Sequence, residues 1–242
     1  MTGLTIFGVP GLPELREGDD LARLISERTE LEDGDILVVA QKAISKIEGR
    51  IVRLHDVEPS ARARELAGDG DPRRIEVILG EAKRVVRARG SLLITETRHG
   101  FVCASSGVDT SNAPELGTVV LLPTDPDASA ARLRSALGEL TGRDVGVVVT
   151  DSFGRAWRQG TTDVAIGAAG VEVLRDLKGS LDPNGYELRS TVIAIADEIA
   201  GAAELVMGKL DRMPVAILRG LDAHGDGHAS DLVMPAERSL FS

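Results

Sequence analysis

The sequence predicts an α+β protein in which mixed β-sheets pack against helices. Short β-branched runs bounded by Gly, Pro or Asp alternate along the chain with segments of helical periodicity. Two adjacent candidate strands, SLLITET and GFVCASS, are connected only by the short RHG segment. Such a short connection suits antiparallel neighbours, so at least one hairpin is expected and a purely parallel sheet is not.

The candidate strands are short aliphatic runs that end at turn-forming residues. They lie at 4–9, 35–40, 50–54, 91–97, 100–106, 118–123, 145–150 and 213–221. The candidate helices carry apolar residues at helical spacing, and several begin at an Asp or Ser that can cap the first turn. They lie at 19–30, 72–88, 129–142 and 190–210.

No internal repeat or low-complexity linker divides the chain. We therefore expect a single domain over residues 1–242, which could contain two subdomains. The Gly-rich stretch DAHGDGHASD predicts a flexible tail at about 222–242.

Composition narrows the possible partners. Hydrophobic residues make up 43% of the 242 residues but aromatic residues only 2%, so the core must consist of Val, Leu, Ile and Ala. A net charge of -10 disfavours nucleic acid or an anionic membrane as the main partner. No stretch combines the length and hydrophobicity of a membrane span or of a signal peptide. The lone Cys103 lies in an apolar run and is expected to be a buried thiol, which suits a cytoplasmic location.

Acids and hydroxyls follow two of the candidate strands. Asp109 lies in GVDTSN, and Asp151 with Ser152 follows the run VGVVVT. Hard divalent cations prefer carboxylate and hydroxyl oxygens, and strand ends can bring such ligands together from distant parts of the chain. The alternative is that DTSN is an ordinary turn whose side chains bond their own backbone.

The segment after Asp151 also carries Arg155, Trp157, Arg158 and Gln159, which could contact phosphate groups. The usual phosphate-binding loops are missing. GAAELVMGKL has six residues rather than four between its glycines, and Leu210 stands where a Ser or Thr should bind magnesium. The acids Asp197 and Glu198 could serve a metal, or could form the polar face of a helix.

Five stretches together resemble one family, the F420 γ-glutamyl ligases (coenzyme F420-0:L-glutamate ligases). They are GLPELREGDDL, DGDILVVAQKAISKIEGR, GVDTSN, VVVTDSFGRAWRQGTTDVAIG and ADEIAGAAELVMGKLDRMPVAILRGL, which occur in the family's order over nearly the whole chain. The family also forms the amino-terminal half of two-domain actinobacterial enzymes. Because this chain ends at DLVMPAERSLFS, a free-standing ligase is expected.

The resemblance implies a cytoplasmic, intertwined homodimer with no P-loop. Its activity would be the GTP-dependent joining of L-glutamate to F420-0, a deazaflavin with a phospholactate tail, through an acyl phosphate. GDP and phosphate would be released. It also implies Mg²⁺ or Mn²⁺, in two sites, with K⁺ as a further candidate ion. Nucleic acid and membrane are not expected partners.

The resemblance also assigns site residues. Asp109 and Asp151 would be catalytic and, with Ser152, would bind the metal. The residues that would contact GTP are Leu12, Pro13, Glu14, Leu15, Gln41, Lys46, Asn112, Gly208 and Lys209. Gln41 stands where relatives commonly have Ser or Thr, and Lys209 where some have Gln. The net charge of -10 opposes binding of such anionic substrates, so Lys46, Arg155 and Arg158 are expected to offset it locally.

Two other classes of function share these residues. A metal-dependent phosphohydrolase acting on nucleotides could use the same two acids without needing glutamate. A non-catalytic nucleotide-binding protein would bind GTP without turnover. The sequence offers no dedicated general base for a hydrolytic water, which favours the ligase.

Overall fold

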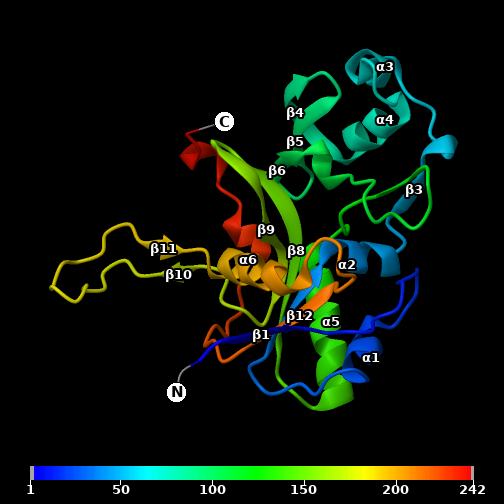
Figure 1. The fold of residues 1–242 in the computed structure, drawn as a ribbon. Coiled ribbons are helices and arrows are strands. Elements are labelled where there is room, and N and C mark those ends of the chain that lie inside the picture. Colours follow the sequence, from blue (N-terminus) through cyan, green and yellow to red (C-terminus); the bar gives the residue numbers. More distant parts are fainter. Residues whose placement is uncertain (1–2, 241–242) are drawn as a thin grey trace.

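The computed structural model describes residues 3–240, and its centre is a mixed five-stranded sheet (Figure 1). The strands pair in the order β1 (Thr5–Gly8), β12 (Val215–Arg219), β2 (Ile36–Ala40), β8 (Gly146–Arg155) and β9 (Arg158–Ala169). β2 and β8 are parallel, and the other neighbours are antiparallel. The sequence prediction of a mixed sheet is confirmed.

Helices cover both faces of this sheet. Alternate residues of β2 point to opposite sides, so Leu37 and Val39 join one buried cluster and Ile36 and Val38 join the other. The first cluster is completed by α1 (Leu21–Ser26), α2 (Gln41–Ile47) and α5 (Pro126–Thr141), and the second by α6 (Ile195–Met207). The result is a helix–sheet–helix sandwich with a core on each face.

The two long helices are fixed to the sheet by carboxylates. On α5, which Asp125 caps at its first turn, Asp127 accepts a hydrogen bond from the backbone N–H of Ala168 in β9 at 2.8 Å. On α6, Asp197 accepts a hydrogen bond from the backbone N–H of Ala165 in β9 at 2.9 Å. Asp197 is therefore a contact between helix and strand.

Residues 51–122 form a second unit with its own core, at the upper right of Figure 1. Leu54, Ile75, Ile78, Leu93 and Val119 are among its buried residues. Its elements are β3 (Ile51–Arg53), η1 (Leu54–Asp56), α3 (Ala61–Ala67), α4 (Pro72–Glu81), β4 (Ala82–Arg89), β5 (Leu92–Thr97), β6 (Val102–Ala104), η2 (Ser105–Gly107) and β7 (Thr118–Val120). β5 and β6 form the predicted antiparallel hairpin. Cys103 on β6 is buried as expected, and burial raises the pKa of its thiol to about 12.

The predicted helix at 72–88 is wrong in its second half. The helix ends at Glu81, and residues 82–89 form β4, which pairs with β5. The β-branched residues Val85 and Val86 favour a strand, and β5, the next strand along the chain, provides the backbone hydrogen-bond partner. The helix predicted at 190–210 begins only at Ile195, and the strand β9 was not predicted.

A thin arm and the carboxyl-terminal segment complete the fold. The arm contains β10 (Arg175–Asp176) and β11 (Val192–Ile193) and extends away from the body in Figure 1. The segment predicted as a flexible tail contributes the buried Ala223 and Ala229 to the second core and contains η3 (Ala229–Leu232) and η4 (Ala236–Arg238). Residues 241–242 of that predicted tail lie outside the described residues. None of the helices described here combines the length and apolar character needed to cross a membrane.

Candidate functional site

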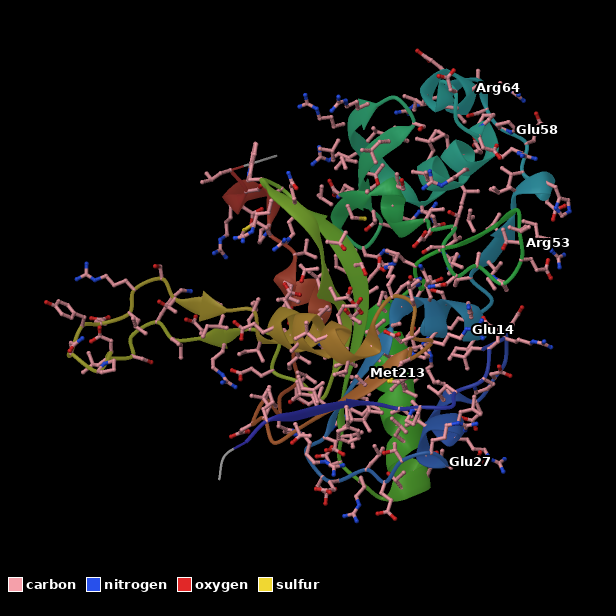
Figure 2. The ribbon with its side chains drawn as sticks, in the orientation of Figure 1. Glu14, Glu27, Arg53, Glu58, Arg64 and Met213 are labelled. Carbon is pink, nitrogen blue, oxygen red and sulfur yellow. The ribbon has the colours of Figure 1, made fainter. Side chains whose placement is uncertain are left out.

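A cavity of about 540 Å³ opens at the edge of the central sheet where β2 ends opposite Thr150 of β8. Asp151 and Ser152 were expected to follow a strand, but they lie within β8, which continues to Arg155 because it pairs there with β9. Asp151 and Ser152 enter it from β8, and Gln41, Lys42 and Lys46 enter it from α2, which begins directly after β2. Three further segments line it, at 12–15, 112–114 and 207–214. In Figure 2 the labelled Glu14 comes from the chain before α1 and Met213 from the chain before β12, and both line this cavity.

Asp151 is a largely desolvated carboxylate. Desolvation by burial raises its pKa to about 7, and the nearby Asp163 carboxylate adds to this rise. The backbone N–H of Ser152 and the ammonium groups of Lys42 and Lys209 act in the opposite direction. Among the described residues, no Lys or Arg forms an ion pair with Asp151. A desolvated carboxylate that contacts no cationic side chain is suited to bind a cation from solution.

Ser152 lies between an acid and a cation. Its hydroxyl donates to Oδ1 of Asp163 at 2.6 Å and accepts from Nζ of Lys209 at 3.0 Å. The second oxygen of Asp163 accepts from the hydroxyl of Thr150 at 3.1 Å. Asp163 is 6% exposed and stands opposite Ser152 in the β8–β9 pairing.

Asp109 reaches the cavity through Lys42. The Lys42 ammonium donates to Oδ2 of Asp109 and to the hydroxyl of Ser111, both at 2.6 Å. The pKa of Asp109 is lowered because the hydrogen bonds from Lys42 and Ser111 outweigh its desolvation, the largest single effect. The same Lys42 charge acts on Asp151, so one lysine couples the two acids that the sequence singled out.

The cavity wall formed by α2 is held by buried polar contacts. Lys46 is 8% exposed and forms an ion pair with Glu14. Gln41 is 2% exposed, and its amide nitrogen donates to the backbone carbonyl of Leu121 at 2.8 Å. These contacts fix α2 against the loop before α1 and against the chain after β7.

Most of the sequence-predicted site residues come together here. The residues that line the cavity are Leu12, Pro13, Glu14, Leu15, Gln41, Lys46, Asn112, Asp151, Ser152, Gly208 and Lys209. Asp109 does not itself line the cavity but contacts Lys42, which does. The expectation that Arg155 and Arg158 offset the charge beside Lys46 is not met, because neither residue lines the cavity. They flank the turn of the β8–β9 hairpin, where Trp157 is 88% exposed.

Sequence reasoning missed four charged side chains that line the site, Lys42, Asp163, Glu204 and Arg212. It also missed the hydroxyl of Thr150. Lys42 stands next to the predicted Gln41 and could have been found from that position. Asp163 could have been found only from the hairpin register, because a bulge near Gly160 shifts the pairing and brings Asp163 opposite Ser152.

The donor set suits a hard divalent cation. Carboxylate and hydroxyl oxygens are the ligands that such cations prefer, and the unpaired, desolvated Asp151 lies beside the hydroxyl of Ser152. Within the described part of the chain, no group of three or more His, Cys, Asp or Glu side chains is arranged to hold a metal. An ion here would therefore combine Asp151 and Ser152 with oxygens from a substrate or water.

Comparison with known proteins identifies the class to which this fold and cavity belong. The family model described as F420-0:Gamma-glutamyl ligase matches residues 11–220, which include every residue that lines the cavity. The chain belongs to the F420-0:γ-glutamyl ligase family, as the sequence motifs predicted.

Individual relatives agree with this assignment. A protein of Methanopyrus kandleri named coenzyme F420:L-glutamate ligase is 52% identical, over 98% of this chain and 97% of its own length. Proteins of the same name from Methanothermobacter thermautotrophicus and Methanocaldococcus jannaschii are 41% and 44% identical. The former alignment covers 99% of both chains, and the latter covers 95% of this chain and 94% of the relative.

Proposed function

We propose that this protein joins L-glutamate to coenzyme F420-0 in a GTP-dependent reaction, releasing GDP and phosphate. The observation that carries the proposal is the near-complete alignment with relatives named for F420:L-glutamate ligation, at 41% to 52% identity. The cavity supports it, because residues from five separate segments that the family resemblance assigns to GTP and metal line one space.

The proposed chemistry has two steps. A carboxylate oxygen of F420-0 attacks the γ-phosphorus of GTP, the bond to the β-phosphate oxygen breaks, and GDP leaves. The amino nitrogen of glutamate then attacks the resulting acyl phosphate and expels phosphate, and the amine loses its proton as the amide forms. The energy of the phosphoanhydride is thereby used to activate a carboxylate that an amine could not attack directly.

In this proposal Lys46 and Lys209 contact phosphate oxygens and offset their charge. Both ammonium groups line the cavity, and Lys42 and Arg212 add two further cations to its wall. This local charge supports nucleotide binding in a chain whose net charge is -10. Leu12 to Leu15, Gln41, Asn112 and Gly208 form the remaining wall around the nucleotide.

Asp109, Asp151 and Ser152 would hold Mg²⁺ or Mn²⁺, and K⁺ remains a candidate for a further site. When bound, such ions neutralise charge that develops on the transferred phosphoryl group. Asp151 is placed to accept a cation on β8, whereas Asp109 is held by Lys42 and must exchange that contact for the ion.

A glutamate-dependence assay tests the proposal and separates it from nucleotide hydrolysis. GDP formation from GTP is measured with both co-substrates and then with F420-0 or L-glutamate omitted. The ligase predicts that GDP forms together with a product that carries an added glutamate, and that omitting F420-0 abolishes GDP formation. GDP formation at an undiminished rate without either co-substrate would instead identify a phosphohydrolase. Binding of GTP with no turnover under any condition would identify a non-catalytic protein.

A further inference from the structure

Asp163 is a buried carboxylate that, among the described residues, forms no direct ion pair with a basic side chain. Only 6% of the residue is exposed, and no ion pair to Asp163 forms among residues 3–240. Its two oxygens accept hydrogen bonds from two hydroxyls, those of Ser152 at 2.6 Å and Thr150 at 3.1 Å. Burying such a carboxylate is costly, so its retention beside the cavity calls for a specific role.

The hydrogen bond to Asp163 orients the hydroxyl of Ser152. A serine hydroxyl has one proton, and here that proton points to Oδ1 of Asp163. The lone pairs of the Ser152 oxygen therefore point away from Asp163, and the Lys209 ammonium donates to this oxygen at 3.0 Å. Ser152 thus already presents its oxygen to a cation at the cavity wall.

We propose that Asp163 is a positioning residue, which holds the Ser152 hydroxyl so that its oxygen binds a divalent cation in the cavity. The proposal rests on the proposed function for the presence of that cation. Asp163 acts through Ser152 and does not itself contact the ion. The Lys209 ammonium occupies the cation's side of Ser152 and moves away when the ion binds.

The arrangement explains why an acid stands at this position. A carboxylate that accepts the hydroxyl proton makes the oxygen a better ligand, in the way that carboxylates behind metal-binding histidines do. A neutral amide could accept the same bond but would add no negative charge. The Asp163→Asn substitution therefore separates the charge from the shape of the side chain.

The test is titration of the protein with Mn²⁺ alone, followed by calorimetry and by the paramagnetic resonance signal of free Mn²⁺. Asp163→Asn is expected to weaken Mn²⁺ binding by about ten- to a hundred-fold, the range found for carboxylates behind metal ligands. Mn²⁺ binding as tight as in the parent protein would overturn the proposal. The matched control is Asp197→Asn, which neutralises another partly buried acid that contacts β9 outside the cavity and should leave Mn²⁺ affinity unchanged.

A double-variant cycle tests whether Asp163 acts through Ser152. In a Ser152→Ala background, Asp163→Asn should cause almost no further loss of Mn²⁺ affinity. A full ten-fold or larger loss in that background would show that Asp163 acts independently, which overturns the proposal. If Asp163→Asn does not fold, Ser152→Ala and Ser152→Thr are compared instead. Ser152→Thr keeps a hydroxyl and should retain Mn²⁺ affinity, whereas Ser152→Ala should lose it. Parental Mn²⁺ affinity of Ser152→Ala would overturn the proposal. These titrations need neither GTP nor F420-0, so their outcome is separate from that of the ligation assay.

Discussion

At the residue scale, Asp109 and Asp151 have different surroundings and are expected to be needed for the same reaction. Asp109 is paired with Lys42, whereas Asp151 is desolvated and has no ion-pair partner within residues 3–240. Asp109→Asn and Asp151→Asn should each abolish ligation while preserving the fold, because each removes a charged oxygen but little volume. Circular dichroism and gel filtration verify folding, and product is measured by mass. Near-normal turnover by a folded variant would show that the acid is dispensable.

The raised pKa of Asp151 predicts a pH-dependent cost to stability in the metal-free protein. Its carboxyl binds a proton up to about pH 7 in the folded state but only up to about pH 4 when unfolded. The folded state therefore holds more protons between these values, and stability falls as pH rises through that window. The free energy of unfolding of Asp151→Asn, relative to that of the parent, should rise by roughly 2–3 kcal/mol from pH 5 to pH 8.

Chemical denaturation with a chelator present, at pH 5 and at pH 8, measures this difference. Asp176→Asn is a suitable control, because Asp176 is exposed and its pKa is lowered by hydrogen bonds with Lys178. If the difference in free energy of unfolding between Asp151→Asn and the parent is the same at pH 5 and pH 8, the pKa of Asp151 is not raised in the folded protein.

Lys46 is expected to contact the phosphates of GTP. It is 8% exposed, lines the cavity and is paired with Glu14, so it is not a solvated surface lysine. Lys46→Met keeps much of the aliphatic stem and removes the charge. Loss of one charge-assisted contact should weaken binding of a non-hydrolysable GTP analogue by about ten- to a hundred-fold.

Calorimetry measures that affinity, with Lys83→Met as the control because Lys83 is 66% exposed in its side chain and pairs with Glu96. Parental affinity of Lys46→Met for the analogue would remove Lys46 from the proposed phosphate contacts.

At the element scale, the β8–β9 hairpin supplies one wall of the site and packs closely on α5. A Cβ atom added at Gly167 in β9 would lie 2.3 Å from the backbone carbonyl oxygen of Pro126 at the start of α5. Gly167→Ala should therefore destabilise the protein by about 1–3 kcal/mol, because either backbone must move. For a chain of this size that lowers the melting temperature by roughly 2–12 °C.

Gly154→Ala is the matched control in the same hairpin, since an added Cβ there meets no atom within 4 Å. It should melt close to the parent temperature. Equal melting temperatures for Gly167→Ala and the parent would show that β9 and α5 can separate without cost.

At the scale of the whole molecule, the arm that carries β10 and β11 is expected to pack in a homodimer. An isolated two-stranded ribbon has little stability of its own. This arm also exposes Leu181 and Tyr186, which are 69% and 74% accessible. The family resemblance implies an intertwined dimer, and an arm of this kind could pack against a second copy of the chain.

Sedimentation over a range of protein concentrations tests this expectation, together with activity at the same concentrations. Dissociation and loss of ligation should coincide on dilution, and a Leu181→Asp, Tyr186→Asp variant should be monomeric at concentrations where the parent is dimeric. Leu140→Asp changes an exposed leucine on α5 and serves as the control. A fully active parental monomer would contradict the expectation.

The sequence alone predicted four of the five strands of the central sheet and the hairpin at 91–106. It also singled out Asp151, which lines the cavity, and Asp109, which contacts the cavity residue Lys42. Those features depend on local composition and periodicity, which read directly from the residues. The family motifs likewise predicted residues in five of the segments that line the cavity. Strand β4 was misassigned because its helix-like spacing was overridden by pairing with β5.

Which side chains meet across the site depends on how distant parts of the chain pack together. Ser152 and Asp163 face each other because of a bulge in the β8–β9 pairing, and Lys42 contacts Asp109 although 67 positions separate them. The desolvation that raises the pKa of Asp151 likewise depends on packing from several distant segments. Register, long-range contact and burial are properties of the folded chain, and a linear pattern of residues does not specify them.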